Sequence, residues 1–271
     1  LRHVPVSINH ATRRRDWDVS VTIVYRVTGA YTGMVHYGLG LKVALASGGK
    51  DSLYAAYREW PVDAFIFLVY EFPVLSPHIV NLKAAIASLS STGVPVLVVR
   101  VSRGSNGGET VEALRRLGAS VLVAGDVYVE DHLRYLEDIA SRAGVKLREP
   151  LWGMDTRELL YKITSEGFQS RIIGVKHEYR ELLGELISRE TAERLDEILT
   201  SKGGDPLGEQ GEYHSVVTSS PLHPAPLRLG EHEGVIDDGY HYILRVDPLG
   251  PPWSPASHPP HAEPQAGDKE G

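Results

Sequence analysis

Apolar runs alternate with segments of helical spacing between residues 41 and 143. The runs contain almost no polar positions, and they lie at 41–46, 64–70, 95–101 and 120–124. Between and after them, apolar residues recur three or four positions apart, which predicts helices over 52–59, 77–91, 108–117 and 130–143. Strands without polar alternation that are separated by helices are typical of a parallel sheet covered on both faces. The pattern therefore predicts the α/β fold class.

The regular alternation loosens after residue 146. Apolar spacing predicts helices over 155–167 and 180–200, with a strand at 171–175 between them. A Gly-rich loop follows at 203–214. The next segment predicts a β-hairpin over 227–246, because Asp237-Asp238-Gly239 has the composition of a hairpin turn.

The two ends of the chain differ from the part between them. The N-terminal segment mixes charges, glycines and one short apolar run, and Met34 stands just before the first convincing strand. One hypothesis is that translation starts near Met34; the other is a genuine arm that adds a strand. The C-terminal end is rich in Pro, His and Gly, which is typical of a disordered tail. The expected divisions are 1–38, 39–145, 146–247 and 248–271.

Composition narrows the classes of function. The chain has 271 residues, of which 42% are hydrophobic and 23% charged, as in ordinary globular proteins. Its net charge of −7 does not favour stable binding of nucleic acid. The absence of cysteine excludes thiolate metal sites and Cys nucleophiles, and it fits a cytoplasmic protein. No apolar run reaches the ~18–20 residues that cross a bilayer, so no membrane association is expected.

The loop after the first predicted strand is a candidate anion site. Ligands of open α/β sheets bind at the carboxyl ends of strands, and the loop there reads Ser47-Gly48-Gly49-Lys50-Asp51-Ser52. Its glycines let backbone N–H groups approach an anion, and the helix that follows contributes unpaired N–H donors. The loop differs from a Walker A sequence because its lysine is followed by aspartate. A plain tight turn with Asp51 or Ser52 as the helix N-cap is the alternative interpretation.

This loop resembles the PP-loop of the adenine nucleotide alpha hydrolase superfamily, whose members split ATP into AMP and pyrophosphate. Three further stretches, at 78–81, 150–153 and 208–215, resemble the H-x-x-N, P-L-W-G and G-E-x-G-E-[YF]-H-[ST] segments of the diphthine–ammonia ligase family. Gly125-Asp126 and Glu130-Asp131 match a variant segment found in part of that family. The resemblance covers residues 41–222. It departs at Gln210, where the family often has glycine, and at Ser215, where threonine is commoner.

The resemblance implies a fold and an activity. The fold is a Rossmann-like (HUP-type) doubly wound parallel sheet over 39–145, followed by a smaller α+β C-terminal domain over 146–247. The activity is ATP-dependent amidation of diphthine, a modified histidine on translation elongation factor 2, to diphthamide. An acyl-adenylate forms, ammonium supplies the nitrogen, and AMP and pyrophosphate leave. ATP and Mg²⁺ are the expected cofactors. No Cys-dependent glutaminase can be present, so free ammonium is the expected donor.

Roles for individual residues follow from the resemblance. The phosphate-binding residues are Ser47, Gly48, Gly49, Lys50, Asp51 and Ser52. Asp51 is also the expected Mg²⁺ ligand and a catalytic residue. Glu209 and Glu212 are expected to hold ammonium or take its proton; without the resemblance they would be read as solvated loop carboxylates. Residues expected at the substrate are His78, Asn81, Asp126, Trp152 and His214.

Purely structural roles stay open for several of these residues. His78 and Asn81 could instead cap a helix, and Trp152 could fill a core. His214 could be a hydrogen-bonded structural residue.

Two other functions remain open from the residues. One is another PP-loop ATP pyrophosphatase, such as a tRNA-modifying ligase, although its sulfur-transferring members usually need cysteine and a tRNA enzyme needs a basic face. The other is a nucleotide-binding regulator without turnover. The expected partners are elongation factor 2 and ammonium, and a homo-oligomer is compatible with the sequence.

Overall fold

The computed structural model of the chain describes residues 22–24, 40–70 and 76–250. From the N-terminal segment it describes strand β1 (Thr22–Val24), which pairs antiparallel with β4. The start of translation near Met34 and the tail from residue 251 lie outside the described residues. Within the described ranges, no helix is long and apolar enough to cross a bilayer.

The first sheet is parallel apart from β1. Its order is β1-β4-β3-β2-β5-β6, so the direction of winding reverses at β2, which lies between β3 and β5. Such a reversal leaves a crevice at the carboxyl ends of the central strands, where ligands bind. The expected doubly wound, Rossmann-like α/β fold is confirmed. The strands are β2 (Leu41–Leu45), β3 (Ala64–Tyr70), β4 (Val96–Val101), β5 (Ala119–Val123) and β6 (Lys146–Arg148).

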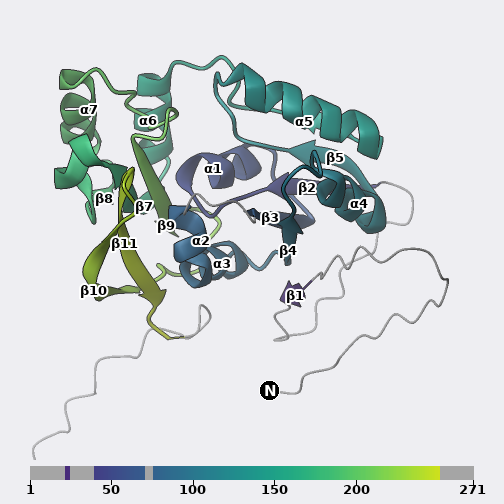
Figure 1. The fold of residues 1–271 in the computed structure, drawn as a ribbon, viewed down its shortest axis with the longest axis horizontal. Coiled ribbons are helices and arrows are strands. Elements are labelled where there is room, and N and C mark those ends of the chain that lie inside the picture. Colours follow the sequence, from purple (N-terminus) through teal and green to yellow (C-terminus); the bar gives the residue numbers. More distant parts are fainter. Residues whose placement is uncertain (1–21, 25–39, 71–75, 251–271) are drawn as a thin grey trace, which may run out of the picture.

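Both faces of this sheet are buried, which explains its apolar strands. Neighbours such as Val43 and Ala44 point to opposite faces and join different hydrophobic clusters. Helices α4 and α5 cover one face, whereas α1 and α3 cover the other (Figure 1). These helices are α1 (Lys50–Arg58), α3 (Leu82–Ser91), α4 (Gly108–Leu117) and α5 (Glu130–Ala143).

The second sheet is antiparallel and is built around β7. Strand β9 pairs with one edge of β7; β8 and β11 share the other edge, and β10 pairs with β11 as the predicted hairpin. Helices α6 and α7 share a hydrophobic cluster with β7, and this cluster is continuous with the core under α1. The elements are α6 (Thr156–Ser165), β7 (Gln169–Lys176), β8 (Leu186–Ile187), α7 (Ala192–Ser201), β9 (Tyr213–Ser219), β10 (Leu229–Asp237) and β11 (His241–Pro248).

The predicted helix over 180–200 is wrong in its first half. The chain forms a 3₁₀ turn, η1 (His177–Leu182), then β8, and becomes α-helical only at α7. Gly184 has φ of 84°, which ends helical geometry. Its N–H donates to the Ile172 carbonyl (3.0 Å), and the following strand pairs with β7. Pairing with a sheet edge therefore overrides the helical spacing of the apolar residues.

The predicted helix over 77–91 is also interrupted. It consists of α2 (Pro77–Val80) and α3, which meet at Asn81, where ψ is 31°. The Asn81 amide donates to the carbonyls of Pro77 (3.0 Å) and Leu244 (2.9 Å), and its Oδ1 accepts the N–H of Val246 (2.7 Å). The side chain is 1% exposed. One buried asparagine therefore joins the first domain to β11.

We expect Asn81→Ala to lower the free energy of unfolding by about 3 kcal/mol, because it leaves a buried N–H and a buried carbonyl without a partner. Urea unfolding of the variant and the wild type measures this. Lys83→Ala is the matched control two residues away, since Lys83 is 80% exposed and its ion pair with Asp247 is long at 3.7 Å. It should change stability by less than about 0.5 kcal/mol. Equal effects of the two substitutions would contradict the structural role of Asn81.

Candidate active site

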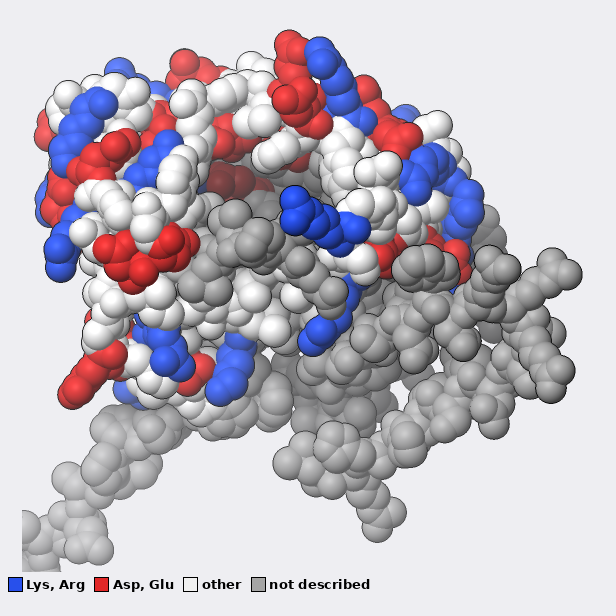
Figure 2. Space-filling model, viewed as in Figure 1, with Lys and Arg blue, Asp and Glu red and all other residues white. Residues whose placement is uncertain are grey.

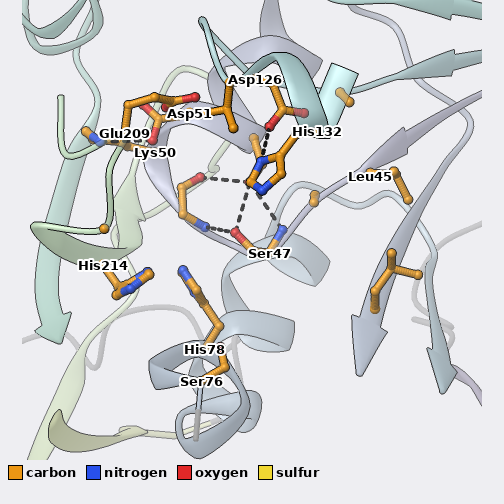
Figure 3. A pocket seen from close by; sticks show the side chains of 18 of the residues that line it. Leu45, Ser47, Lys50, Asp51, Ser76, His78, Asp126, His132, Glu209 and His214 are labelled. Atoms are coloured by element: carbon orange, nitrogen blue, oxygen red, sulfur yellow. Dashed lines mark hydrogen bonds and ion pairs between the residues drawn. The ribbon is translucent and has the colours of Figure 1, made fainter. Parts of the chain in front are cut away.

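The loop 47–52, called the phosphate loop below, opens into a pocket of about 800 Å³. The pocket lies at the reversal point of the first sheet and reaches the second domain. Its walls come from the ends of β2, β3 and β5, from α2 and α5, and from residues 208–211 and 213–215. Figure 2 shows a hollow on this face with acidic side chains inside it, and Figure 3 shows the labelled side chains around the cavity.

The backbone of the phosphate loop is held from several sides. Gly48 has φ of 80°, and a Cβ there would lie 3.0 Å from the Cα of Ala85. Its carbonyl accepts the N–H of Val217 in β9 (2.9 Å). The Ser52 hydroxyl donates to the Gly49 carbonyl (3.1 Å) and accepts the Ser47 N–H (3.2 Å). The loop is therefore a fixed turn that both domains support.

Helix α1 begins two residues earlier than predicted. Its N-cap is Gly49, which makes no side-chain capping bond, so the alternative with Asp51 or Ser52 as the N-cap is wrong. Helix N-termini without a side-chain cap leave N–H donors for an anion. The first residues of α1, Lys50 to Ser52, line the pocket. The local geometry is thus that of an anion site.

Lys50 is 3% exposed and turns toward the second domain. Its Nζ donates to Asp51 Oδ2 (2.9 Å) and to the Leu207 carbonyl, and it lies 4.6 Å from the centre of the Tyr213 ring. Burial lowers the pKa of Lys50, but the Asp51 carboxylate and Tyr213 outweigh this, and the net direction is upward. The amine therefore stays charged and holds the segment around residue 207 against the phosphate loop.

Asp51 has one oxygen paired and one oxygen without a partner. Oδ2 accepts from Lys50, whereas Oδ1 is buried and has no hydrogen-bond partner among the described residues. A lone carboxylate oxygen is a fitting ligand for a hard cation. No group of three or more His, Asp or Glu side chains in the described part of the chain is arranged to hold a metal ion.

Three further carboxyl groups meet beside the end of β5. Glu209 Oε1 accepts the N–H of Val127 (3.0 Å), and Glu149 Oε2 accepts the N–H of Asp126 (3.2 Å). Burial, then the Asp51 charge, raises the pKa of Glu209 to about 7. Burial, then the Asp126 charge, raises the pKa of Glu149 to about 8. We call Asp126, Glu149 and Glu209 the acidic group. Because three carboxyl groups lie together there, this part of the site favours a bound cation or proton.

Sequence reasoning missed two of the residues near this end of the pocket. Glu149 follows β6 directly, so its place at the carboxyl end of a parallel strand could have indicated it. His132 lies on α5, and its Nδ1 is 3.1 Å from Asp126 Oδ1, a hydrogen bond that raises the pKa of His132. No sequence motif distinguishes His132 from a solvent-facing helix residue.

Two histidines form the opposite wall. His78 on α2 and His214 on β9 point toward one another below the phosphate loop (Figure 3), with ring centres 5.5 Å apart. Burial, then the Lys50 charge, lowers the pKa of His78 to about 4. Burial, then the neighbouring His78, lowers the pKa of His214 to about 3. Both imidazoles are therefore neutral near pH 7 and can donate and accept hydrogen bonds.

Other residues assigned from the sequence lie behind this lining. Glu212 is 3% exposed, and its two oxygens accept the N–H groups of Asp205 (3.1 Å) and Gln210 (3.0 Å). Asn81 joins α2 to β11, and Trp152 is partly buried in the turn after β6. In the described structure, the pocket lining includes none of these three. Their catalytic or substrate-binding roles stay predictions.

Comparisons with known proteins agree with this arrangement of domains. The family model described as the diphthamide synthase N-terminal domain matches residues 40–147, and that of the diphthamide synthase C-terminal domain matches residues 155–247. A search of curated proteins gives no match.

One similar solved structure is titled a predicted subunit of tRNA methyltransferase from Methanocaldococcus jannaschii. It shares 15% identity, with coverage of 68% of this chain and 98% of that chain, at a TM-score of 0.34. A likeness at this level says nothing of activity. The two family matches cover both domains that build the pocket, and the chain therefore belongs to the diphthamide synthase family and is an ATP-dependent ligase of the diphthine–ammonia type.

Proposed function

We propose that the chain converts diphthine on translation elongation factor 2 into diphthamide through an acyl-adenylate, with ammonium as the nitrogen donor and AMP and pyrophosphate as products. The observation that carries the proposal is the shared pocket. The phosphate loop of the first domain and residues 208–211 of the second domain line the same cavity. Activation of a carboxylate and attack by ammonia need both reacting groups beside one nucleotide.

The phosphate loop performs the first step in this proposal. Its N–H groups, with the hydroxyls of Ser47 and Ser52, bind the phosphates of ATP, and the start of α1 adds the positive end of its dipole. The diphthine carboxylate then attacks the α-phosphorus. Pyrophosphate leaves with its charge offset by these fixed donors, which need no rearrangement during the reaction.

We place Mg²⁺ at Asp51. The residues fit, because Oδ1 lacks a hydrogen-bond partner within the described structure, and Mg²⁺ sites commonly combine one carboxylate with phosphate oxygens. When bound, the ion neutralises charge on the departing pyrophosphate. Lys50 keeps Asp51 in place through its 2.9 Å hydrogen bond to Oδ2.

The acidic group serves the second step. Ammonium is a cation and must lose a proton before its nitrogen can attack. Asp126 and Glu209 line the pocket, and a carboxylate whose pKa lies near 7 is suited to accept that proton. We assign the proton transfer to Glu209. Glu212 instead holds the loop in shape, since both of its oxygens already accept backbone N–H groups.

Asp51→Ala is expected to abolish AMP formation and ATP–pyrophosphate exchange with diphthine-bearing elongation factor 2, since it removes the carboxylate proposed to hold Mg²⁺. Circular dichroism should show an unchanged fold. Asp138→Ala, an exposed aspartate on α5 that pairs with Arg142, is the control and should keep full activity. Exchange that occurs only with tRNA would contradict the proposed substrate, and unchanged AMP formation in Asp51→Ala would remove Asp51 from the site.

Glu209→Gln is expected to separate the two steps. The glutamine side chain keeps an oxygen that can accept the Val127 N–H, but it cannot take a proton from ammonium. ATP–pyrophosphate exchange should therefore persist, while amidation falls about 100-fold. In the wild type, protonation of Glu209 should reduce amidation as the pH falls through about 7. The Glu209→Gln variant should not show this fall in rate at low pH. Rates of AMP release at saturating ATP, measured from pH 5.5 to 8.5 with ammonium varied, test both points; an identical pH profile in the variant would show that another group accepts the proton.

A further inference from the structure

A row of aromatic rings connects the pocket with the surface of the second domain. It starts at His78 and His214, which line the pocket. His214 contacts His241 at the start of β11, with ring centres 5.3 Å apart, and His241 contacts Tyr240 at 4.6 Å. Each pair is close to perpendicular, at 88°, 75° and 82° along the row. Such edge-to-face contacts are favourable, and they fix the rings relative to one another.

The outer end of the row is exposed. The Tyr240 side chain is 60% exposed, more than any other large hydrophobic residue in the described part of the chain, whereas His241 is 7% exposed. Tyr240 belongs to the turn between β10 and β11, in the hairpin at the edge of the second sheet (Figure 1). The row therefore runs from a nucleotide-facing wall to a solvent-facing tyrosine.

The turn that presents Tyr240 is ordered by its own carboxylates. Asp237 Oδ1 accepts the N–H of Gly239 (2.9 Å). Asp238 Oδ1 accepts the N–H groups of Tyr240 (2.9 Å) and His241 (2.6 Å). His177 anchors the turn from η1 through a 2.9 Å contact with Asp237. A rigid backbone lowers the entropy cost of binding, so this tyrosine is preorganised to contact a partner.

We propose that residues 237–241, with Tyr240 as the anchor, are a docking surface for the protein that carries the modified histidine. The inference rests on the proposed function. A protein substrate differs from ATP and ammonium because it must bind outside the pocket while one side chain reaches the phosphate loop. The ring row joins these two places directly. Exposed tyrosines on rigid elements are frequent energetic centres of protein interfaces.

The proposal assigns Tyr240 to binding of the protein substrate alone. Tyr240→Ala should raise the KM for diphthine-bearing elongation factor 2 by about tenfold, the loss typical of truncating an interface tyrosine. The KM values for ATP and ammonium should stay within about twofold of the wild type. Tyr240→Phe, which keeps the ring, should restore most of the affinity. Val235→Ala is the matched control, because Val235 lies in the same hairpin and is 45% exposed but has no place in the row.

Steady-state kinetics of the full chain, with each of the three substrates varied in turn, decide the matter. A wild-type chain that does not amidate the protein overturns the proposed function itself. Amidation by the wild type with an unchanged protein KM in Tyr240→Ala overturns only the docking surface. An equal rise in the KM for ATP, or an equal effect of Val235→Ala, also overturns it, because the change would then be a general one.

Discussion

The site depends on one mechanical constraint: the phosphate loop must be held open by groups from outside its own strand and helix. Two links to the second domain do this. The Gly48 carbonyl accepts a hydrogen bond from Val217 in β9, and the Lys50 ammonium donates to the Leu207 carbonyl. A short glycine turn alone has many conformations. Because both links cross between domains, packing of the second sheet against the first supports the conformation of the loop.

The same packing creates the electrostatic division of the pocket. On one side, Asp126, Glu149 and Glu209 lie together, with His132 in contact with Asp126 and Lys50 paired to the neighbouring Asp51. On the other side, His78 and His214 are neutral because burial disfavours their charged forms. The start of α1 in the phosphate loop offers backbone N–H donors to an anion. In the proposed function, a polyanionic nucleotide and a small cation occupy separate parts of one cavity, which a reaction between an adenylated carboxylate and ammonia requires.

The local spacing of apolar residues predicts much of the fold. Strand β3 and helices α4 and α5 have the boundaries that apolar spacing predicts, since each buries one continuous face or lies between two covered faces. Strand β8 could not be predicted, because its two residues, Leu186 and Ile187, become a strand only by pairing with β7. Glu149, His132 and His241 were missed for a related reason. Their roles arise where distant elements converge. The position of Glu149 directly after β6 could have indicated it, whereas nothing in the sequence near His132 or His241 differs from a solvated position.

Glu209 and Glu212 show how strongly position decides chemistry. They lie three residues apart in one Gly-rich loop, and from sequence the two carboxylates are interchangeable. In the structure, Glu212 faces inward, and its two oxygens accept N–H groups of its own loop. Glu209 faces the pocket and accepts one N–H from the other domain. Burial, and then the nearby Asp51 charge, raise its pKa. One carboxylate of the loop therefore holds its backbone in shape, while the other is left to face the pocket.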